Sequence, residues 1–447
     1  MRQKKYTIYK AFNYFMLLYN RPKMQKNLAR LRNYHLGIEN SDFSKIKNTL
    51  LEEILEYAKN NCPYYKEIFK NNSVCISNID DFNRIPFLDK EIIRLNYSSL
   101  QSIDINKVCN YIMNTGGTTG TPLTFPVSSH KEYEHHEFAF ELFGYEKGDE
   151  IVSFDGIDVS EDKIKKNIFW KQMSRTNLPY GKISFSVLYL NDETVLVYIN
   201  ELNKIKPDFI RGFPSAINYL AVFILENKIQ LAFDLKGVYL TAETIFPNQI
   251  SNIKKSFKCP VSLEYGHSEI SVFAYTIDDT YEYYCSPFYG YTEIIDAEGM
   301  HVNVGEVGEI VVTGFYNKAM PFIRYKTGDL ALFNGNKDGL TRLARIDGRT
   351  QDYILNENRD KIFLVGLIYG GHHKFLDSIK KWQIIQNKPG LIDIKIIKGD
   401  SFCINDEMAI TELFIKNDGI RSNIEFVNEI GFTSRGKNKF LLQNTIN

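Results

Sequence analysis

The chain of 447 residues has few cysteines, no long apolar run and no excess of charge of either sign. Its six cysteines include no Cys-x-x-Cys pair, which argues against a disulfide framework or a zinc module and favours a reducing compartment. A membrane span would need about 18 consecutive apolar residues, and no such run occurs. Because 54 basic residues balance 54 acidic ones, an extended nucleic-acid surface is not expected. We therefore expect a cytoplasmic protein without a signal peptide or a membrane span, and we leave its oligomeric state open.

The length of the chain exceeds what one core usually organises, which predicts at least two domains. Helical patterns at 216–226 and 248–257 alternate with short apolar runs at 151–154, 238–240 and 261–263. This alternation predicts an α/β fold with a mostly parallel sheet covered by helices. After Ser271, short alternating runs separated by glycines indicate an antiparallel, barrel-like β unit. We place a large domain at 1–347 and a small, mobile α+β lid at 348–447.

Residues 114–122 read Asn-Thr-Gly-Gly-Thr-Thr-Gly-Thr-Pro and lie between an apolar run and an alternating run. Glycines let backbone N–H groups turn toward an anion, and threonine hydroxyls add further donors. The segment is not a Walker A loop, because it contains no lysine and no Gly-Lys-Ser/Thr follows. It predicts a phosphate-binding loop, with a plain surface loop as the alternative.

Four further short motifs follow this loop. Tyr-Gly-His-Ser-Glu at 265–269 comes after an apolar run, where a glycine turn would place a ring, a hydroxyl and a carboxylate at a strand end. Tyr-Lys-Thr-Gly-Asp at 325–329 places a carboxylate just after a tight turn, suited to accept hydrogen bonds from two ribose hydroxyls. Gly-Arg-Thr-Gln-Asp occupies 348–352, and Gly-Lys-Asn-Lys occupies 436–439. Each motif alone would usually be structural or solvated.

The order of these five motifs resembles the adenylate-forming superfamily of acyl-CoA synthetases, peptide-synthetase adenylation domains and luciferases, over about residues 85 to 440. Within it the chain is similar to phenylacetate-CoA ligases, and especially to CapK-type proteins of capsular-polysaccharide gene clusters. The closer resemblance depends on Arg-Gly-Phe-Pro-Ser at 211–215, on Thr-Ala-Glu at 241–243, and on Gln383 and Gln386. It implies an enzyme that joins a carboxylic acid to ATP, giving an acyl-adenylate and pyrophosphate, and then transfers the acyl group to a nucleophile.

The resemblance also implies roles for individual residues. The ATP phosphates would be bound by Thr115, Gly116, Gly117, Thr118, Thr119 and Gly120. Glu269, beside Ser268, would hold Mg²⁺; Asp329 would bind the ribose, and Tyr265 with Gly266 would lie near the adenine. Lys437 would bridge the carboxylate and the α-phosphate, and Arg349 would contact ribose or phosphate. The acid would lie against Gly212, Phe213, Pro214, Ser215, Thr241, Ala242, Glu243 and His267.

The sequence departs from the superfamily pattern in three places. Gly116 stands where a serine is usual, and Gln351 stands at the hinge position that is commonly Asp or Lys. The polar passage 356–361, Asn-Glu-Asn-Arg-Asp-Lys, stands where a glycine usually lines the pantetheine tunnel. A glycine there permits close approach of the backbone, so its replacement makes coenzyme A less favoured as the acceptor.

Three functions stay open at this point. The leading one is transfer of the acyl group to an amine, on an amino acid or an amino sugar, in surface-polysaccharide assembly. The second is an aryl- or short-chain acyl-CoA ligase, with coenzyme A as the thiol acceptor. The third is a catalytically silent binding protein on the same fold, against which the retained Glu269, Asp329 and Lys437 count.

Overall fold

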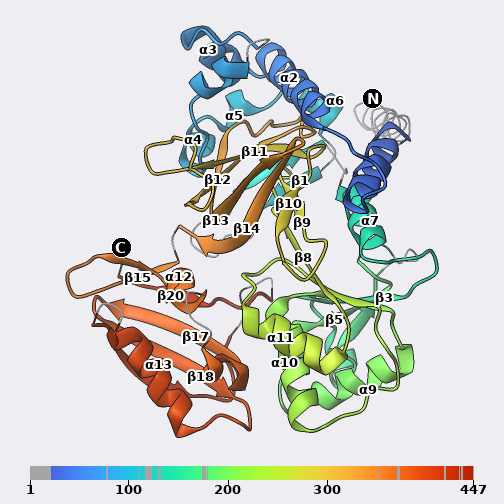
Figure 1. The fold of residues 1–447 in the computed structure, drawn as a ribbon, viewed down its shortest axis with the longest axis vertical. Helices are drawn as coiled ribbons and strands as arrows, with labels where there is room; N and C mark the ends of the chain where they lie inside the picture. The colour runs from blue at the N-terminus through green and yellow to red at the C-terminus, as the bar shows by residue number, and fades with distance from the viewer. Residues whose placement is uncertain are drawn as a thin grey trace. The chain divides into compact units, whose positions relative to one another are not determined.

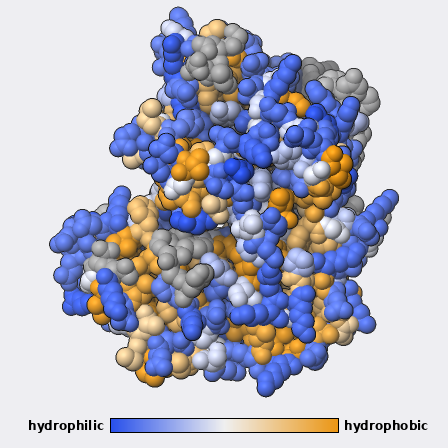
Figure 2. Space-filling model, viewed as in Figure 1, coloured by the Kyte–Doolittle hydropathy of each residue, from blue (hydrophilic) through white to orange (hydrophobic). Residues whose placement is uncertain are grey.

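The computed structural model describes residues 22–76, 79–109, 111–115, 123–128, 132–173, 178, 180–350, 352–369, 373–416, 419–431, 433 and 436–445. The chain forms two compact units (Figure 1). Unit 1 comprises Met1–Phe143 and Glu264–Ile346, and unit 2 comprises Gly144–Leu263 and Asp347–Asn447. Hydrophilic residues dominate the face shown in Figure 2, and no helix of the described residues is long and apolar enough to cross a membrane.

Unit 1 begins with helices. A helix at 22–35 precedes α2 (Ser44–Asn61), α3 (Pro63–Asn71), η1 (Ile79–Arg84), α4 (Lys90–Leu95), α5 (Tyr97–Leu100) and α6 (Ile105–Val108). The Asp89 carboxylate caps α4 by accepting a hydrogen bond from the Ile92 N–H at 2.8 Å. A short hairpin, β1 (Tyr111–Asn114) with β2 (Thr124–Val127), and α7 (Glu132–Leu142) complete this part.

The second part of unit 1 is an antiparallel sheet, as the alternating sequence pattern predicts. Its strands are β9 (Phe273–Tyr275), β10 (Tyr283–Cys285), β11 (Gly290–Ile295), β12 (Val307–Gly314), β13 (Tyr325–Lys337) and β14 (Leu340–Arg349). They follow the spatial order β11-β12-β13-β14-β10-β9, and β9 pairs with the end of β8 (Val261–Gly266). Strand β11 is buried on both faces, whereas the residues of β13 are mostly only partly buried.

A buried ion pair joins the sheet of unit 1 to the segment around η1. The Arg324 guanidinium donates two hydrogen bonds to the Glu293 carboxylate on β11, at 2.8 and 3.2 Å. Its remaining nitrogen donates to the backbone oxygens of Asn83 and Ile85, both at 2.8 Å. Both side chains are almost fully buried, with exposed fractions of 4% and 0%. Burial raises the pKa of Glu293, and the Arg324 charge opposes that rise.

The core of unit 2 is a parallel sheet covered by helices. Its strands are β3 (Ile151–Asp155), β4 (Trp170–Gln172), β5 (Ile183–Ser186), β6 (Phe209–Gly212), β7 (Gly237–Leu240) and the first part of β8. The order is β8-β7-β6-β3-β5-β4, with parallel pairing except at the edge strand β4. The helices are α8 (Glu161–Ile164), η2 (Val187–Tyr189), α9 (Val195–Ile205), α10 (Pro214–Glu226) and α11 (Pro247–Phe257). Every residue of β6 and β7 is buried, as expected for strands covered on both faces.

The C-terminal part of unit 2 forms its own small sheet. Strands β17 (Ile379–Lys388), β18 (Leu391–Lys398), β19 (Arg421–Phe426) and β20 (Leu441–Gln443) have the order β19-β18-β17-β20. The hairpin β15 (Tyr353–Leu355) with β16 (Lys361–Phe363), α12 (Leu364–Tyr369), η3 (Lys374–Ser378) and α13 (Ile404–Lys416) accompany it. Alternate residues of β18, Ile392, Ile394 and Ile396, are fully buried and pack with Trp382 and Phe414. The predicted α/β fold with a small α+β C-terminal part is confirmed.

We expect Arg324→Met to lower the free energy of unfolding by about 3–5 kcal/mol, because it leaves the Glu293 carboxylate buried without its counter-charge. Urea unfolding of the full chain measures this loss. The control is the double variant Arg324→Met/Glu293→Leu, which removes both charges and is expected to recover most of the stability. A single variant within about 1 kcal/mol of the unmodified protein would contradict a structural role for the pair.

Candidate active site

In unit 1, two tyrosines bind two of the predicted carboxylates. The Tyr265 hydroxyl, at the end of β8, donates to Asp329 Oδ2 at 2.8 Å. The Tyr325 hydroxyl, at the start of β13, donates to Glu269 Oε1 at 2.8 Å. The structure therefore brings together the Tyr-Gly-His-Ser-Glu and Tyr-Lys-Thr-Gly-Asp motifs, which lie about sixty residues apart in the sequence.

Glu269 is a buried carboxylate that is held ionised. Burial alone would raise its pKa, but the charge of His267 and hydrogen bonds from His267 and Tyr325 outweigh burial and lower the pKa to about 2. His267 Nδ1 lies 3.2 Å from Glu269 Oε2. The Nε2 atom of His267 is buried and has no hydrogen-bond partner among the described residues. Glu269 can thus act as a fixed negative charge over the whole range in which enzymes work.

Asp329 lies in a different local structure from the one that the sequence predicts. We expected a tight turn before it, but residues 325–329 belong to the continuous strand β13. The register with β12 shifts here, Gly328 has φ of +76°, and Thr327 Oγ1 donates to the Ile310 carbonyl oxygen at 2.7 Å. The motif is a β-bulge, in which the extra residues re-aim the Asp329 side chain, and its glycine supplies the positive φ.

The glycine-rich loop is described only at its start and end. The Thr115 N–H donates to the Leu123 carbonyl oxygen at 2.8 Å, and its hydroxyl accepts from the Leu123 N–H at 2.9 Å. These two bonds close the base of the loop. Gly116, Gly117, Thr118, Thr119, Gly120 and the hinge residue Gln351 lie outside the described residues. The phosphate-binding role of the loop stays a prediction.

In unit 2, the loop that carries Lys437 lies against the carboxyl ends of the parallel strands. Gly436, with φ of +73°, approaches Gly156 so closely that a β-carbon on it would collide with the backbone after β3. The Lys437 N–H donates to Thr433 Oγ1 at 3.1 Å, and its carbonyl oxygen accepts from the Thr433 N–H at 2.9 Å. The close contact therefore explains why the residue before Lys437 is a glycine. The backbone of Lys437 itself is fixed by two hydrogen bonds.

Glu243 binds this loop to the start of α10. Its Oε1 accepts from the Asn438 N–H at 2.6 Å, and its Oε2 accepts from the Ser215 N–H at 3.1 Å. Burial raises the pKa of Glu243, whereas the bonds from Ser215 and Asn438 and the charge of Lys437 oppose the rise. The structure thus assembles residues from the 211–215, 241–243 and 436–439 motifs around one carboxylate.

Other predicted residues of unit 2 lie near this arrangement or support it. Gly212 ends β6, where a β-carbon would lie 2.5 Å from the Phe154 carbonyl oxygen. Phe213 and Pro214 begin α10. Gln383 on β17 donates to the Lys439 carbonyl oxygen at 2.7 Å. This residue of the CapK-like pattern therefore holds the segment that carries the Gly-Lys motif. Arg349 ends β14, and its N–H donates to Asp352 Oδ2 at 3.0 Å.

The polar passage 356–361 forms the turn of the β15–β16 hairpin. Asn356 is buried and exchanges hydrogen bonds with Asp360, and its carbonyl oxygen accepts from the Arg359 N–H at 3.0 Å. Arg359 has φ of +67°, and Lys361 Nζ lies 4.6 Å from the centre of the Tyr353 ring. These contacts give the passage a role in folding. Its influence on whether coenzyme A or an amine is the acceptor stays a prediction.

Sequence reasoning missed three strained residues beside the predicted motifs. Ile270 follows Glu269 with φ of +55°, Ala242 lies within Thr-Ala-Glu with φ of +72°, and Arg324 precedes Tyr325 with φ of +48°. A positive φ at a β-branched residue such as Ile270 is rare and costs on the order of 1–3 kcal/mol. Such strain clusters at functional sites, but no sequence signal marks it.

Comparison with known proteins finds relatives over most of the chain. The CapK C-terminal domain family matches residues 354–444. The chain is 28% identical over 422 residues to Protein CapK of Staphylococcus aureus, covering 91% of this chain and 90% of that protein. It is 24% identical to phenylacetate-coenzyme A ligase of Pseudomonas putida, covering 71% and 74%. Over most of its length the chain is similar to Protein CapK, and its C-terminal part matches the CapK C-terminal domain family.

Solved structures give the fold. The structure of 2-hydroxyisobutyryl-CoA ligase in the postadenylation state matches with a TM-score of 0.68 and 17% identity, covering 90% of each chain. The GH3.15 acyl acid amido synthetase matches with a TM-score of 0.56 and 13% identity, covering 86% of each chain. The predicted resemblance to the adenylate-forming superfamily is confirmed, and the relatives that carry it are ATP-dependent, AMP-forming ligases.

The residues present fit a magnesium ion that is held mainly by nucleotide phosphates. Mg²⁺ keeps several waters and is usually bound by one or two carboxylates together with substrate phosphates. Glu269 is one such carboxylate, buried and ionised. The described residues contain no group of three or more His, Cys, Asp and Glu side chains that would form an all-protein metal cage.

The lowered pKa of Glu269 gives a pH-dependent stability. A carboxylate with a depressed folded-state pKa contributes stability that is present above its unfolded pKa, near 4.5, and is lost as the pH falls toward 2. We expect the free energy of unfolding to fall more between pH 5 and pH 3 in the unmodified protein than in Glu269→Gln, as measured by urea titration. Equal losses in the two proteins would show that Glu269 is not held ionised.

Proposed function

We infer that the protein activates a carboxylic acid with ATP and transfers the acyl group to an amine, in the assembly of a surface polysaccharide. The observation that carries the inference is Lys437, presented by a bonded turn at the carboxyl ends of the parallel strands of unit 2. The similarity to Protein CapK over 91% of the chain supports the biological setting, and such chemistry belongs in the cytoplasm.

In the first step the carboxylate oxygen attacks the α-phosphorus of ATP, and the bond to pyrophosphate breaks. Both reactants are anionic, so the site must supply positive charge and hydrogen-bond donors where they meet. We assign that charge to Lys437, with the loop from Thr115 to Gly120 binding the departing phosphates and Arg349 binding the nucleotide. Glu269 would hold Mg²⁺, which would supply further positive charge. The carboxylate of Asp329 would accept from the ribose hydroxyls, beside Tyr265.

In the second step the acceptor attacks the acyl carbonyl carbon, loses a proton and releases AMP. The residues around Glu243, namely Gly212 to Ser215 and Thr241 to Glu243, are assigned to the acid, together with His267. An amine acceptor is favoured because 356–361 forms an ordered, side-chain-rich hairpin turn where a pantetheine chain would need close approach. A coenzyme A ligase is the second candidate, favoured by the similarity to phenylacetate-coenzyme A ligase.

Lys437→Ala is expected to lower acid-dependent pyrophosphate release by about two to four powers of ten, because it removes one electrostatic stabiliser of the transition state. Calorimetry should show ATP binding largely retained. The matched control is Lys439→Ala, two residues along the same segment, which should release pyrophosphate at close to the normal rate. Normal release by the Lys437 variant would remove this residue from the mechanism.

The acceptor is identified by its product. Purified protein receives the acid, ATP and Mg²⁺ together with coenzyme A and a panel of amino acids and amino sugars, and mass spectrometry distinguishes thioester from amide. We expect an amide, formed at least as readily as any thioester. Rapid thioester formation with no amide from any amine would establish the coenzyme A ligase instead.

A further inference from the structure

Lys381, on β17, is a buried lysine to which the proposed adenylation gives no role. Its exposed fraction is 7%, and its Nζ donates to the Ile430 carbonyl oxygen at 2.7 Å. Burial lowers the pKa of Lys381 to about 8, against the raising effect of Glu243 and Glu429, so the ammonium is still protonated at neutral pH. A methionine would fill a similar space without the cost of burying a charge. Packing alone therefore does not account for a lysine at this position.

Strand β17 holds both ends of the segment that carries Lys437. Lys381 bonds Ile430 at one end, and Gln383 bonds the Lys439 carbonyl oxygen at the other. Lys381 and Gln383 are two positions apart on the strand, so their side chains lie on the same face. Because Lys437 lies between the two bonds, β17 sets where its turn begins and ends.

Lys381 also lies close to the groups that bind Glu243. Lys381, Ser215 and Asn438 line one small hollow in unit 2. The N–H groups of Ser215 and Asn438 are the donors to the Glu243 carboxylate. A nearby cation favours the ionised form of a carboxyl group, and the ionised form is the stronger acceptor. Lys437 is a second cation that acts on Glu243, against the effect of burial.

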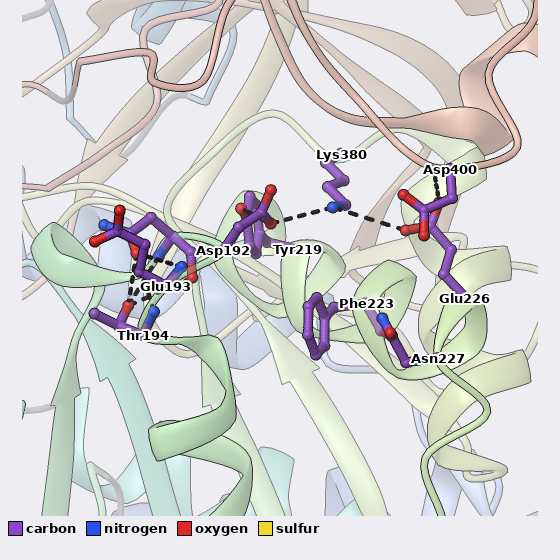
Figure 3. Close-up of polar contacts among 10 residues, drawn as sticks. Asp192, Glu193, Thr194, Tyr219, Phe223, Glu226, Asn227, Lys380 and Asp400 are labelled. Carbon is purple, nitrogen blue, oxygen red and sulfur yellow. Dashed lines mark hydrogen bonds and ion pairs between the residues drawn. The ribbon is translucent and has the colours of Figure 1, made fainter.

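The neighbouring residue, Lys380, fixes β17 itself. Lys380 Nζ lies 3.1 Å from Asp192 Oδ1 and 3.8 Å from Glu226 Oε2, and Figure 3 shows it between these carboxylates, beside Tyr219. Glu226 is the last residue of α10, and the first turn of the same helix donates to Glu243. The strand and the Glu243 carboxylate are therefore both tied to one helix.

We propose that Lys381 is a positioning residue for Lys437. Its ammonium holds the Ile430 carbonyl oxygen and supplies a counter-charge to Glu243, and together these contacts fix the turn from which the Lys437 side chain extends. This role rests on the proposed function, in which Lys437 stabilises the adenylation transition state. Lys381 acts through Lys437 and takes no part in the chemical step.

Lys381→Met removes the donor and the charge but keeps much of the length of the side chain. Its kcat for acid-dependent pyrophosphate release should be about ten- to a hundredfold lower, the effect of one hydrogen bond from a charged group, with little change in the KM for ATP. Lys381→Arg keeps the charge and should recover most of the rate. The matched control is Lys388→Met, at the exposed end of the same strand, which should release pyrophosphate normally.

Thermal melting shows whether each variant is folded, and Lys381→Gln, which keeps a donor without the charge, replaces Lys381→Met if that variant is not. The pH profile separates positioning from a general loss of structure. Without the cation, the pKa of Glu243 rises, so release should fall at a higher pH on the acidic side than in the unmodified protein. Lys381→Arg should keep the original profile. A rate that is normal, or that is lower by one factor at every pH, would overturn the proposal.

Hydrogen exchange followed by mass spectrometry tests the turn without any substrate. The amides of Thr433, Lys437 and Asn438 are bonded in this turn. They should exchange on the order of tenfold faster in Lys381→Met and at the normal rate in Lys388→Met. Unchanged exchange in the Lys381 variant would overturn the proposal. If exchange responds as expected but the unmodified protein releases no pyrophosphate with any acid, the proposed function fails while the role of Lys381 in ordering the turn stands.

Discussion

The carboxylate of Glu243 joins two segments of unit 2 that are more than two hundred residues apart in the sequence. It accepts one N–H from the start of α10 and one from Asn438, next to Lys437. A half-buried carboxylate that accepts backbone N–H groups is a strong, directional anchor. The position of the Lys437 turn against the parallel strands depends on this anchor and on the close contact of Gly436 with Gly156. The proposed chemistry of unit 2 requires both.

In unit 1, neighbouring side chains keep a buried carboxylate ionised. Glu269 is buried, yet the His267 charge and the Tyr325 hydroxyl keep its pKa near 2. An ionised carboxylate in a buried position suits a metal ion bound to phosphates, because it needs no proton release when the nucleotide arrives. The neighbouring Ile270, in a strained left-handed conformation, indicates that the local backbone is shaped for this position rather than for stability.

Much of this arrangement could be predicted from the sequence, and the reason is physical. The apolar runs of β6 and β7 indicate strands that are buried on both faces, and the structure confirms this. The alternation along β11 predicts its antiparallel pairing correctly, but five of its six residues are buried, so the alternation does not mark a solvent-facing side. The bulge before Asp329 was predicted wrongly as a tight turn, because a glycine with positive φ serves equally well in either. The Arg324–Glu293 pair depends on two residues that are distant in sequence, so no local pattern predicts it.

The central claim is that the chain splits ATP between the α- and β-phosphates in the presence of an acid. Phosphorus NMR of the complete reaction tests this directly, with the unmodified protein, ATP, Mg²⁺ and a panel of carboxylic acids. Lys437 and Glu269 are assigned to an attack on the α-phosphorus, so the account predicts AMP and pyrophosphate in equal amounts, formed only when the acid is present. ADP and inorganic phosphate as the acid-dependent products would contradict it.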